Sequence, residues 1–320
     1  KNNAGVAHYV GLTTCGSIWA CPVCSAQVRN HRAGEISEAT ARWDRAGNTV
    51  YMATFTAPHD LGDRLRPLLG TIADGFRAVV AGRTWTAMKK RLGIVGTIRS
   101  MEVTHGRSGW HPHLHVLIYV QGDMEAAGLA SMVTYLRSRW RDFVVSKGYR
   151  PPSDQHGVDV QRCASAEEAG LYIAKTQDGR SVGNEVARAD LKQGRKASRT
   201  PFEILDDFRW SGDCADLDLW NEYETATKGR QCITWSKALR QILQAAEEQS
   251  NEEIVAADVG GDDVAIIDGE TWKAITQVPG LPAGLLDAIE RGGLDEANDL
   301  LGRHHLGSIC PPDLALLSKD

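Results

Sequence analysis

The chain has 320 residues, of which 42% are hydrophobic and 24% charged, a composition typical of a globular protein with a sizeable core. It shows no apolar run long enough to span a bilayer and no charged-then-apolar leader, so we expect a cytoplasmic protein without a membrane partner. The net charge of −5 hides an asymmetry. Residues 1–200 carry 27 Lys and Arg against 17 Asp and Glu, whereas residues 201–320 carry 9 against 24. The basic part fits a polyanionic partner.

Three cysteines near the start of the sequence have the spacing C-x5-C-x2-C, namely Cys15, Cys21 and Cys24. The C-P-x-C element provides the tight turn that zinc ligation favours, and four ligands would close a structural zinc site. His8, His31 or a cysteine before Lys1 would be the fourth ligand. A buried thiol cluster without metal is the alternative.

The predicted elements follow in chain order. Apolar spacing and turn residues predict six strands or helices up to residue 147, namely a helix after Cys24, a strand at 49–60, a helix over 64–92, hairpin strands at 93–106 and 110–120, and a helix at 124–147. Further along we expect a strand at 158–163, a helix at 165–177, a polar basic loop at 178–200, helices at 201–210, 215–227 and 234–249, an acidic linker, a strand at 264–269 and a helix at 282–293.

This order predicts an α+β fold with a central antiparallel β-sheet flanked by helices. We expect four segments: a cysteine-rich zinc knuckle and helix at 1–48, a catalytic domain at 49–200, a helical extension at 201–250 and an acidic C-terminal module at 251–320.

The strand GWHPHLHVLIYV (109–120) places three histidines at alternate positions, His111, His113 and His115, so all three share one face. If Gly106 pairs with Gly109 across the turn, Glu102 lies opposite His113 on that same face. One carboxylate and two or three imidazoles suit Mg²⁺, Mn²⁺ or Zn²⁺. A half-exposed strand that happens to carry histidines is the alternative.

The segment EEAGLYIAKTQ contains a candidate nucleophile. On a helix, Glu168, Tyr172 and Lys175 lie on one face. A tyrosine hydroxyl near a metal-polarised phosphodiester can attack phosphorus, with the glutamate as general base, and the lysine would either neutralise the phosphate or position the tyrosine. Taken alone, Tyr172 is more often a packing residue.

The histidine strand resembles two known signatures. One is the histidine-triad signature of nucleotide hydrolases, and the other is the HUH signature of endonucleases that nick single-stranded DNA. The ordered set TFTAPH, E…WHPHLHV and EEAGLYIAK resembles the three motifs of rolling-circle replication initiator (Rep) proteins of the HUH superfamily, in the single-tyrosine family of Gram-positive and actinobacterial plasmids and integrative elements. The cysteine knuckle and the later segments TPFEILDDF and ITWSKALR also match, so the resemblance covers about residues 10–245.

The resemblance implies the HUH endonuclease fold at 49–200 and a nick of one strand at a replication origin, with a covalent bond from Tyr172 to the 5′ phosphate and a free 3′ hydroxyl. It implies that His113 and His115 bind Mg²⁺ or Mn²⁺ with Glu102 as third ligand, while His111 lies beside the metal or contacts DNA. Glu168 matches the residue that activates water at termination. Thr54, Thr56 and His59 fall in the first motif, whose implied role is fold and DNA placement.

Candidate DNA contacts come from two places. Trp110 either stacks on a base or packs under the hairpin. The basic loop is either a phosphate-contacting surface or a solvated segment, and its cations are Arg180, Arg188, Lys192, Arg195, Lys196 and Arg199.

The expected partner is single-stranded or origin-hairpin DNA. A host helicase and polymerase are also expected, because the sequence shows no nucleotide-binding loop of its own. A histidine-triad hydrolase and a non-catalytic zinc-containing DNA-binding protein are the rival functions. A related transposase or relaxase would share the chemistry.

Overall fold

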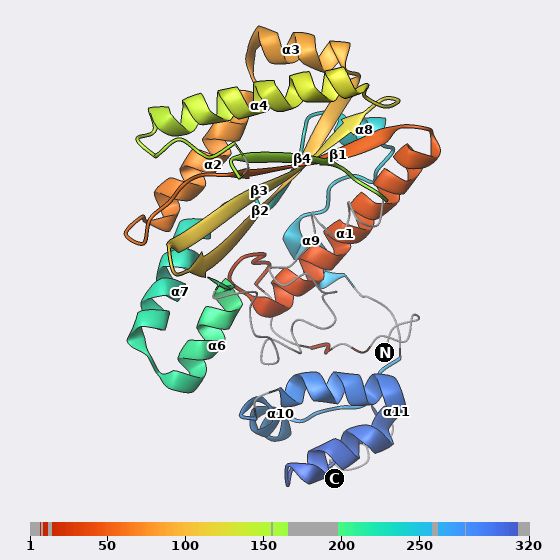
Figure 1. Ribbon diagram of the computed structural model, residues 1–320. Coiled ribbons are helices and arrows are strands. Elements are labelled where there is room, and N and C mark those ends of the chain that lie inside the picture. The colour runs from red at the N-terminus through yellow and green to blue at the C-terminus, as the bar shows by residue number, and fades with distance from the viewer. Residues whose placement is uncertain are drawn as a thin grey trace.

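The computed structural model describes residues 7, 9–11, 15–154, 156–165, 198–257, 262–278 and 280–312. Its centre is an antiparallel sheet with the strand order β4-β1-β3-β2-β5, and β6 pairs with β2 (Figure 1). The strands are β1 (Thr49–Thr56), β2 (Ile94–Gly106), β3 (Gly109–Val120), β4 (Val158–Arg162), β5 (Ser198–Arg199) and β6 (Ile233–Trp235). The predicted α+β class with a central antiparallel sheet is confirmed.

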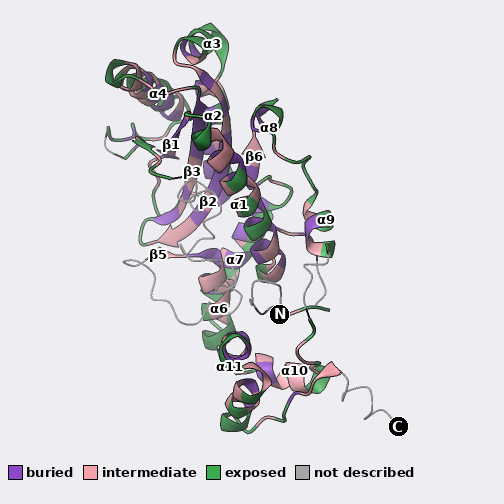
Figure 2. Cartoon of the chain, turned by 90° about the vertical axis from the view of Figure 1, so that its right-hand side faces the viewer, coloured by how far each residue is buried: buried purple, intermediate pink, exposed green. Residues whose placement is uncertain are grey.

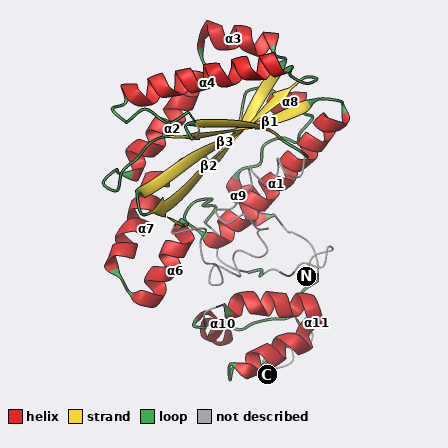
Figure 3. Cartoon of the chain, in the orientation of Figure 1, coloured by secondary structure: helices red, strands yellow, loops and turns green. Residues whose placement is uncertain are grey.

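Most of the described helices lie around this sheet, and the last two of them pack together apart from it (Figure 3). In chain order they are α1 (Pro22–Arg45), α2 (Leu65–Val79), α3 (Gly82–Arg91), α4 (Ala126–Ser146), α6 (Pro201–Ser211), α7 (Cys214–Thr227), α8 (Leu239–Ile242), α9 (Asn251–Ala256), α10 (Gly269–Thr276) and α11 (Leu281–Arg303). None of the helices in these described ranges is long and apolar enough to cross a membrane.

The two faces of the sheet are covered by different helices (Figure 1). Phe55 packs edge-on against Phe76 of α2 and Trp140 of α4, which cover one face. On the other face the Tyr119 hydroxyl lies 2.7 Å from Thr40 Oγ1 of α1. Side chains alternate along a strand, so the odd-numbered positions of β3 from His111 to Tyr119 share the α1 face. The histidines therefore lie on the side of the sheet that α1 covers.

The structure differs from three predicted elements. The helix expected over 64–92 is two helices, because the chain turns at Gly82, where φ is +85°. The helix expected at 234–249 is wrong: residues 233–235 form β6, which pairs with Ile98–Ser100 of β2, and only the short α8 follows. The strand expected at 264–269 is reduced to one isolated bridge between Ile266 and Cys310.

Buried residues, purple in Figure 2, belong to two hydrophobic clusters. The large one fills both sides of the sheet and includes Ile254 of α9. The small one joins α10 and α11 with residues from the other end of the chain: the Tyr9 hydroxyl donates to the Pro282 carbonyl at 2.7 Å, and the Ala7 amide donates to Glu290 Oε1 at 2.9 Å. The predicted segment boundaries stay predictions, although Ile254 belongs to the first core.

Candidate functional site

The hairpin formed by β2 and β3 sets the geometry of the candidate site. Gly106 pairs with Gly109 across the turn, and Gly109 has φ +89°, a conformation that glycine adopts readily. The ladder then runs without a shift through Glu102 opposite His113 and Ser100 opposite His115. This is the register that the sequence predicts.

The imidazole of His115 is held from two sides. Its Nε2 lies 2.8 Å from Glu102 Oε2 on β2, and its Nδ1 lies 3.1 Å from Thr54 Oγ1 on β1. The ring of His113 lies next along the strand, with its centre 6.1 Å from that of His115. The buried Nδ1 of His113 has no hydrogen-bond partner within the part of the chain that the structure describes. A carboxylate and two imidazoles thus share one face.

Burial and neighbouring charges decide the protonation of these groups. Burial lowers the pKa of His113 to about 4, helped by the charges of His115 and His59 and opposed by Glu102. Burial also lowers the pKa of His111 to about 3, with further contributions from His113 and His59. Both rings are neutral near pH 7, the form in which imidazole binds a metal.

Glu102 is ionised for a different reason. Burial raises the pKa of its carboxyl, but the hydrogen bond with His115 and the charges of His115, His113 and Arg29 outweigh burial and leave the pKa below its ordinary value. Arg29 comes from α1 and is 2% exposed. The first helix therefore contributes a buried positive charge to the electrostatics of this face.

A row of imidazoles continues from His113 toward the hairpin tip. The ring centres of His111 and His113 lie 3.9 Å apart, and those of His59 and His111 lie 4.5 Å apart. Beyond them is an open pocket of about 610 Å³, which is lined by His59, Gly106, Arg107, Ser108, Gly109, His111 and Ser198. The histidine face is thus continuous with a pocket that has polar groups and one arginine in its wall.

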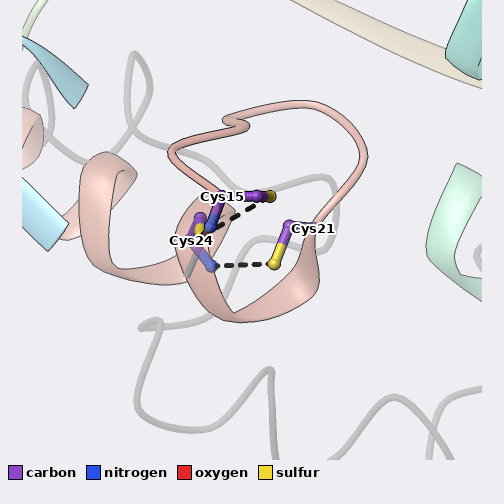
Figure 4. Close-up of side chains that lie close together, drawn as sticks. All are labelled: Cys15, Cys21 and Cys24. Atoms are coloured by element: carbon purple, nitrogen blue, oxygen red, sulfur yellow. Dashed lines mark hydrogen bonds between the residues drawn. The ribbon is translucent and has the colours of Figure 1, made fainter. Parts of the chain in front are cut away.

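The cysteine cluster forms a second candidate site at the start of α1 (Figure 4). One ligand atom each from Cys15, Cys21 and Cys24 lies within 4.8 Å of the others, so this group could hold a metal ion such as zinc. The Cys15 and Cys24 sulfurs are 4.0 Å apart, and the Cys24 amide donates to Cys21 Sγ at 3.5 Å. Across the described ranges, the histidine face holds no group of three ligands as tight as this one.

The pKa values of two of these thiols are shifted in opposite directions. Burial raises the pKa of Cys21 to about 11, whereas a hydrogen bond from the Ser17 backbone lowers the pKa of Cys15. His31 is exposed and does not belong to the cluster, and His8 lies outside the described residues. The fourth ligand therefore stays undetermined.

Many predicted site residues lie outside the described part of the chain. They include the whole candidate nucleophile helix and most of the basic loop, namely Glu168, Tyr172, Lys175, Arg180, Arg188, Lys192, Arg195 and Lys196.

Two predicted DNA contacts are placed differently by the structure. Trp110 is 2% exposed and stacks on Tyr223 of α7 at 6.2 Å between ring centres, so its ring offers no open face to a base. This corrects the base-stacking prediction in favour of packing under the hairpin. Arg199 forms ion pairs of 2.7 Å with Asp207 and Asp216, which occupy its guanidinium in place of a phosphate.

Sequence reasoning missed the specific parts played by Thr54, His59 and Arg29. The first two were attributed to fold and DNA placement, yet Thr54 contacts His115 and His59 contacts His111. The sequence gives no sign that β1 pairs with β3, and this pairing is what sets Thr54 opposite His115.

Comparison with known proteins gives the family. A model of a family described as replication protein, Rep, matches residues 12–276. The chain belongs to this family of replication proteins. The "Protein rep" of Streptomyces lividans is 33% identical to this chain, and the alignment covers 86% of this chain and 75% of the relative. No solved structure matches the chain.

Two further relatives are more distant. The "Neomycin resistance protein" of Streptomyces cyanogenus is 30% identical over 72% of this chain and 68% of its own length. The "Protein rep" of Bacillus amyloliquefaciens is 23% identical over 78% of this chain and 67% of its own length. The resemblance to Rep proteins stated from the motifs is therefore confirmed. In this Rep chain the matched region contains the histidine face and the cysteine cluster.

Proposed function

We propose that this Rep chain initiates rolling-circle plasmid replication by nicking one DNA strand with Tyr172, within an HUH endonuclease fold. The observation that carries the proposal is the β2–β3 register, which sets Glu102 opposite His113 and brings it 2.8 Å from His115. Two imidazoles and an ionised carboxylate on one face form a donor set suited to a divalent cation.

His113, His115 and Glu102 would hold a Mg²⁺ or Mn²⁺ ion, with His111 beside it. The Nδ1 of His113 is buried and has no hydrogen-bond partner among the described residues, which supports a role for this side chain as a metal ligand. When bound, such an ion supplies Lewis-acid polarisation of a phosphate oxygen.

The protein's own groups would carry out the covalent step. The Tyr172 hydroxyl loses its proton to Glu168 or to water, and its oxygen attacks phosphorus. The bond from phosphorus to the 3′ oxygen breaks, and this oxygen takes up a proton to become the free 3′ hydroxyl. Lys175 would neutralise charge on the phosphate. At termination Glu168 would activate water or the reaction would run in reverse, which releases the strand from Tyr172.

The surroundings of the histidine face support a DNA substrate. The open pocket at the hairpin tip leads to His111 and carries Arg107, and the chain up to residue 200 has a net charge of +10. A single strand with negative phosphates could reach the histidines through this pocket. A host helicase and polymerase would extend the strand from the 3′ hydroxyl.

The proposal is tested by trapping the covalent intermediate. Overlapping labelled single-stranded oligonucleotides that cover both strands of the replicon encoding the chain are incubated with the protein and Mn²⁺, then run on a denaturing gel. We expect one oligonucleotide to form an adduct with the wild type and none with Tyr172→Phe or His113→Ala. The matched control is Tyr135→Phe, because that hydroxyl donates to the Val79 carbonyl near the opposite face of the sheet.

Other outcomes would select the rival functions. If no oligonucleotide forms an adduct and nucleotide phosphoramidates are hydrolysed instead, the chain is a histidine-triad hydrolase. If DNA binds equally well to the wild type and Tyr172→Phe but no strand is cut, the chain is a non-catalytic DNA-binding protein.

A further inference from the structure

Thr54 contacts the candidate metal ligand His115 from a neighbouring strand. The β1–β3 register sets the two residues opposite each other, and Thr54 Oγ1 lies 3.1 Å from His115 Nδ1. The second ring nitrogen, Nε2, faces Glu102 Oε2 at 2.8 Å. The imidazole is therefore held at both nitrogens, by one strand on each side.

We infer that Thr54 is a positioning residue that fixes the ring of His115 with Nε2 directed toward the metal position. The inference rests on the proposed function, since it assumes that His115 binds the metal. In metal sites, the nitrogen that does not bind the metal commonly meets an outer partner that sets the tautomer and the ring orientation.

The chemistry of the hydroxyl explains why threonine suits this position. In the tautomer whose Nε2–H donates to the Glu102 carboxylate, Nδ1 is an acceptor and the Thr54 hydroxyl donates to it. With a metal on Nε2, the proton resides on Nδ1, and the same hydroxyl oxygen accepts. A hydroxyl can play both parts without moving its oxygen, whereas a carboxylate could only accept.

The stiffness of threonine in a strand adds to this role. A β-branched side chain has few χ1 rotamers, so the strand backbone fixes the position of Oγ1. Thr54 is also central in the sheet, because β1 has β3 on one side and β4 on the other. The hydroxyl therefore remains at a fixed distance from the histidine strand.

Thr56 provides a matched comparison on the same face of β1. It lies opposite His113 in the register, but its hydroxyl donates to the His156 backbone carbonyl, and among the described residues it forms no hydrogen bond with a histidine ring. Replacing either threonine by valine removes one hydroxyl at nearly constant volume from the same strand. A difference between the two variants therefore reports the contact with His115 rather than a general effect on β1.

The experiment measures Mn²⁺ binding to the full chain by calorimetry at pH 7, without DNA. The variants are Thr54→Val, Thr54→Ser, Thr56→Val and His115→Ala, each checked by circular dichroism for folding. We expect Thr54→Val to bind Mn²⁺ about tenfold more weakly than the wild type. Thr54→Ser should restore most of the affinity, and Thr56→Val should leave it unchanged.

A second measurement follows the tautomer directly. In ¹⁵N-histidine-labelled chain with Mg²⁺, long-range proton–nitrogen spectra should show His115 with its proton on Nδ1 in the wild type and in Thr54→Ser. We expect the Thr54→Val spectrum to show a mixture of tautomers.

The outcomes separate this inference from the proposed function. If Thr54→Val binds Mn²⁺ as the wild type does while His115→Ala loses binding, the role of Thr54 is refuted and the metal site stands. If His115→Ala also binds as the wild type does, the metal site itself is refuted. Equal losses in Thr54→Val and Thr56→Val would make the effect a general one on β1 and overturn the inference.

Discussion

Cys24 is completely buried at the first turn of α1, and its sulfur lies 4.0 Å from that of Cys15. Two sulfurs 4.0 Å apart can both lie at the Zn–S length of about 2.3 Å from one ion, and the Cys21 sulfur lies within 4.8 Å of them. We predict that the purified chain contains about one zinc per molecule and that Cys24→Ser lowers this content to near zero. The measurement is inductively coupled plasma mass spectrometry after gel filtration without chelator.

The control for this prediction is another buried thiol. Cys232 is 3% exposed and its sulfur lies 3.5 Å from the Met101 carbonyl, far in sequence from the cluster. Cys232→Ser should retain the zinc. Zinc content that is the same in both variants would refute the cysteine site, and a wild type without zinc would favour the buried thiol cluster.

At the scale of single residues, the sequence predicted those contacts whose geometry follows from one short turn. Glu102 could be assigned to the histidine face because once Gly106 pairs with Gly109 every opposite pair follows. The contact of Thr54 with His115 joins residues 61 positions apart and depends on which strand lies beside β3. Trp110 was ambiguous, since its burial depends on Tyr223 of a distant helix.

Among the elements, the β2–β3 hairpin is most sensitive at its tip. Gly109 has φ +89°, and a Cβ there would lie 3.0 Å from both the Asp60 carbonyl oxygen and Leu61 Cα. We predict that Gly109→Ala destabilises the fold by roughly 2–3 kcal/mol, through left-handed strain and this backbone overlap. Urea unfolding followed by tryptophan fluorescence measures the change.

Gly122 separates the two causes. It has φ +70°, but nothing lies within 4 Å of the position its Cβ would take. Gly122→Ala should therefore lower the free energy of unfolding by only about 1 kcal/mol. Equal losses in the free energy of unfolding for the two variants would mean that the loop around residue 60 moves away from the new methyl group and does not support the hairpin.

The elements with strong local patterns were predicted well, and those that need distant partners were not. The helix at 126–146 and the hairpin strands follow from spacing alone. A helix was predicted at 234–249, yet residues 233–235 form β6 because the free edge of β2 offers them a partner. Tertiary pairing overrides propensity there.

On the scale of the whole molecule, residues 7 and 9 pack into the small C-terminal core. Tyr9 lies edge-on to Trp272 at 4.7 Å and donates to the Pro282 carbonyl. We predict that Tyr9→Ala speeds amide hydrogen exchange in α10 and α11 at least tenfold and leaves β3 unchanged, because it removes one wall of that core. Hydrogen exchange with mass spectrometry measures both regions.

Val10 provides the control, since it is 64% exposed beside Tyr9. Val10→Ala should leave exchange in α11 as it is in the wild type. Unchanged exchange in Tyr9→Ala would show that the small core holds without the N-terminal residues.

Large-scale organisation was the hardest to predict. The charge asymmetry was plain in the sequence, but no local pattern indicates that residues near position 8 join a core formed after residue 264. The acidic linker predicted after residue 250 begins with the helix α9, whose Ile254 packs into the main core. Both features arise from contacts between distant segments, which periodicity does not report.

The contact between Tyr9 and Pro282 spans 273 residues, and that between Ala7 and Glu290 spans 283. A ribosome that adds about 5–20 residues per second needs roughly 14–55 s to synthesise that interval. During this time Tyr9 has no contact with Pro282, although the strands that carry the histidine face are already synthesised. The small core can therefore close only after residues 281–290 of α11 have been synthesised.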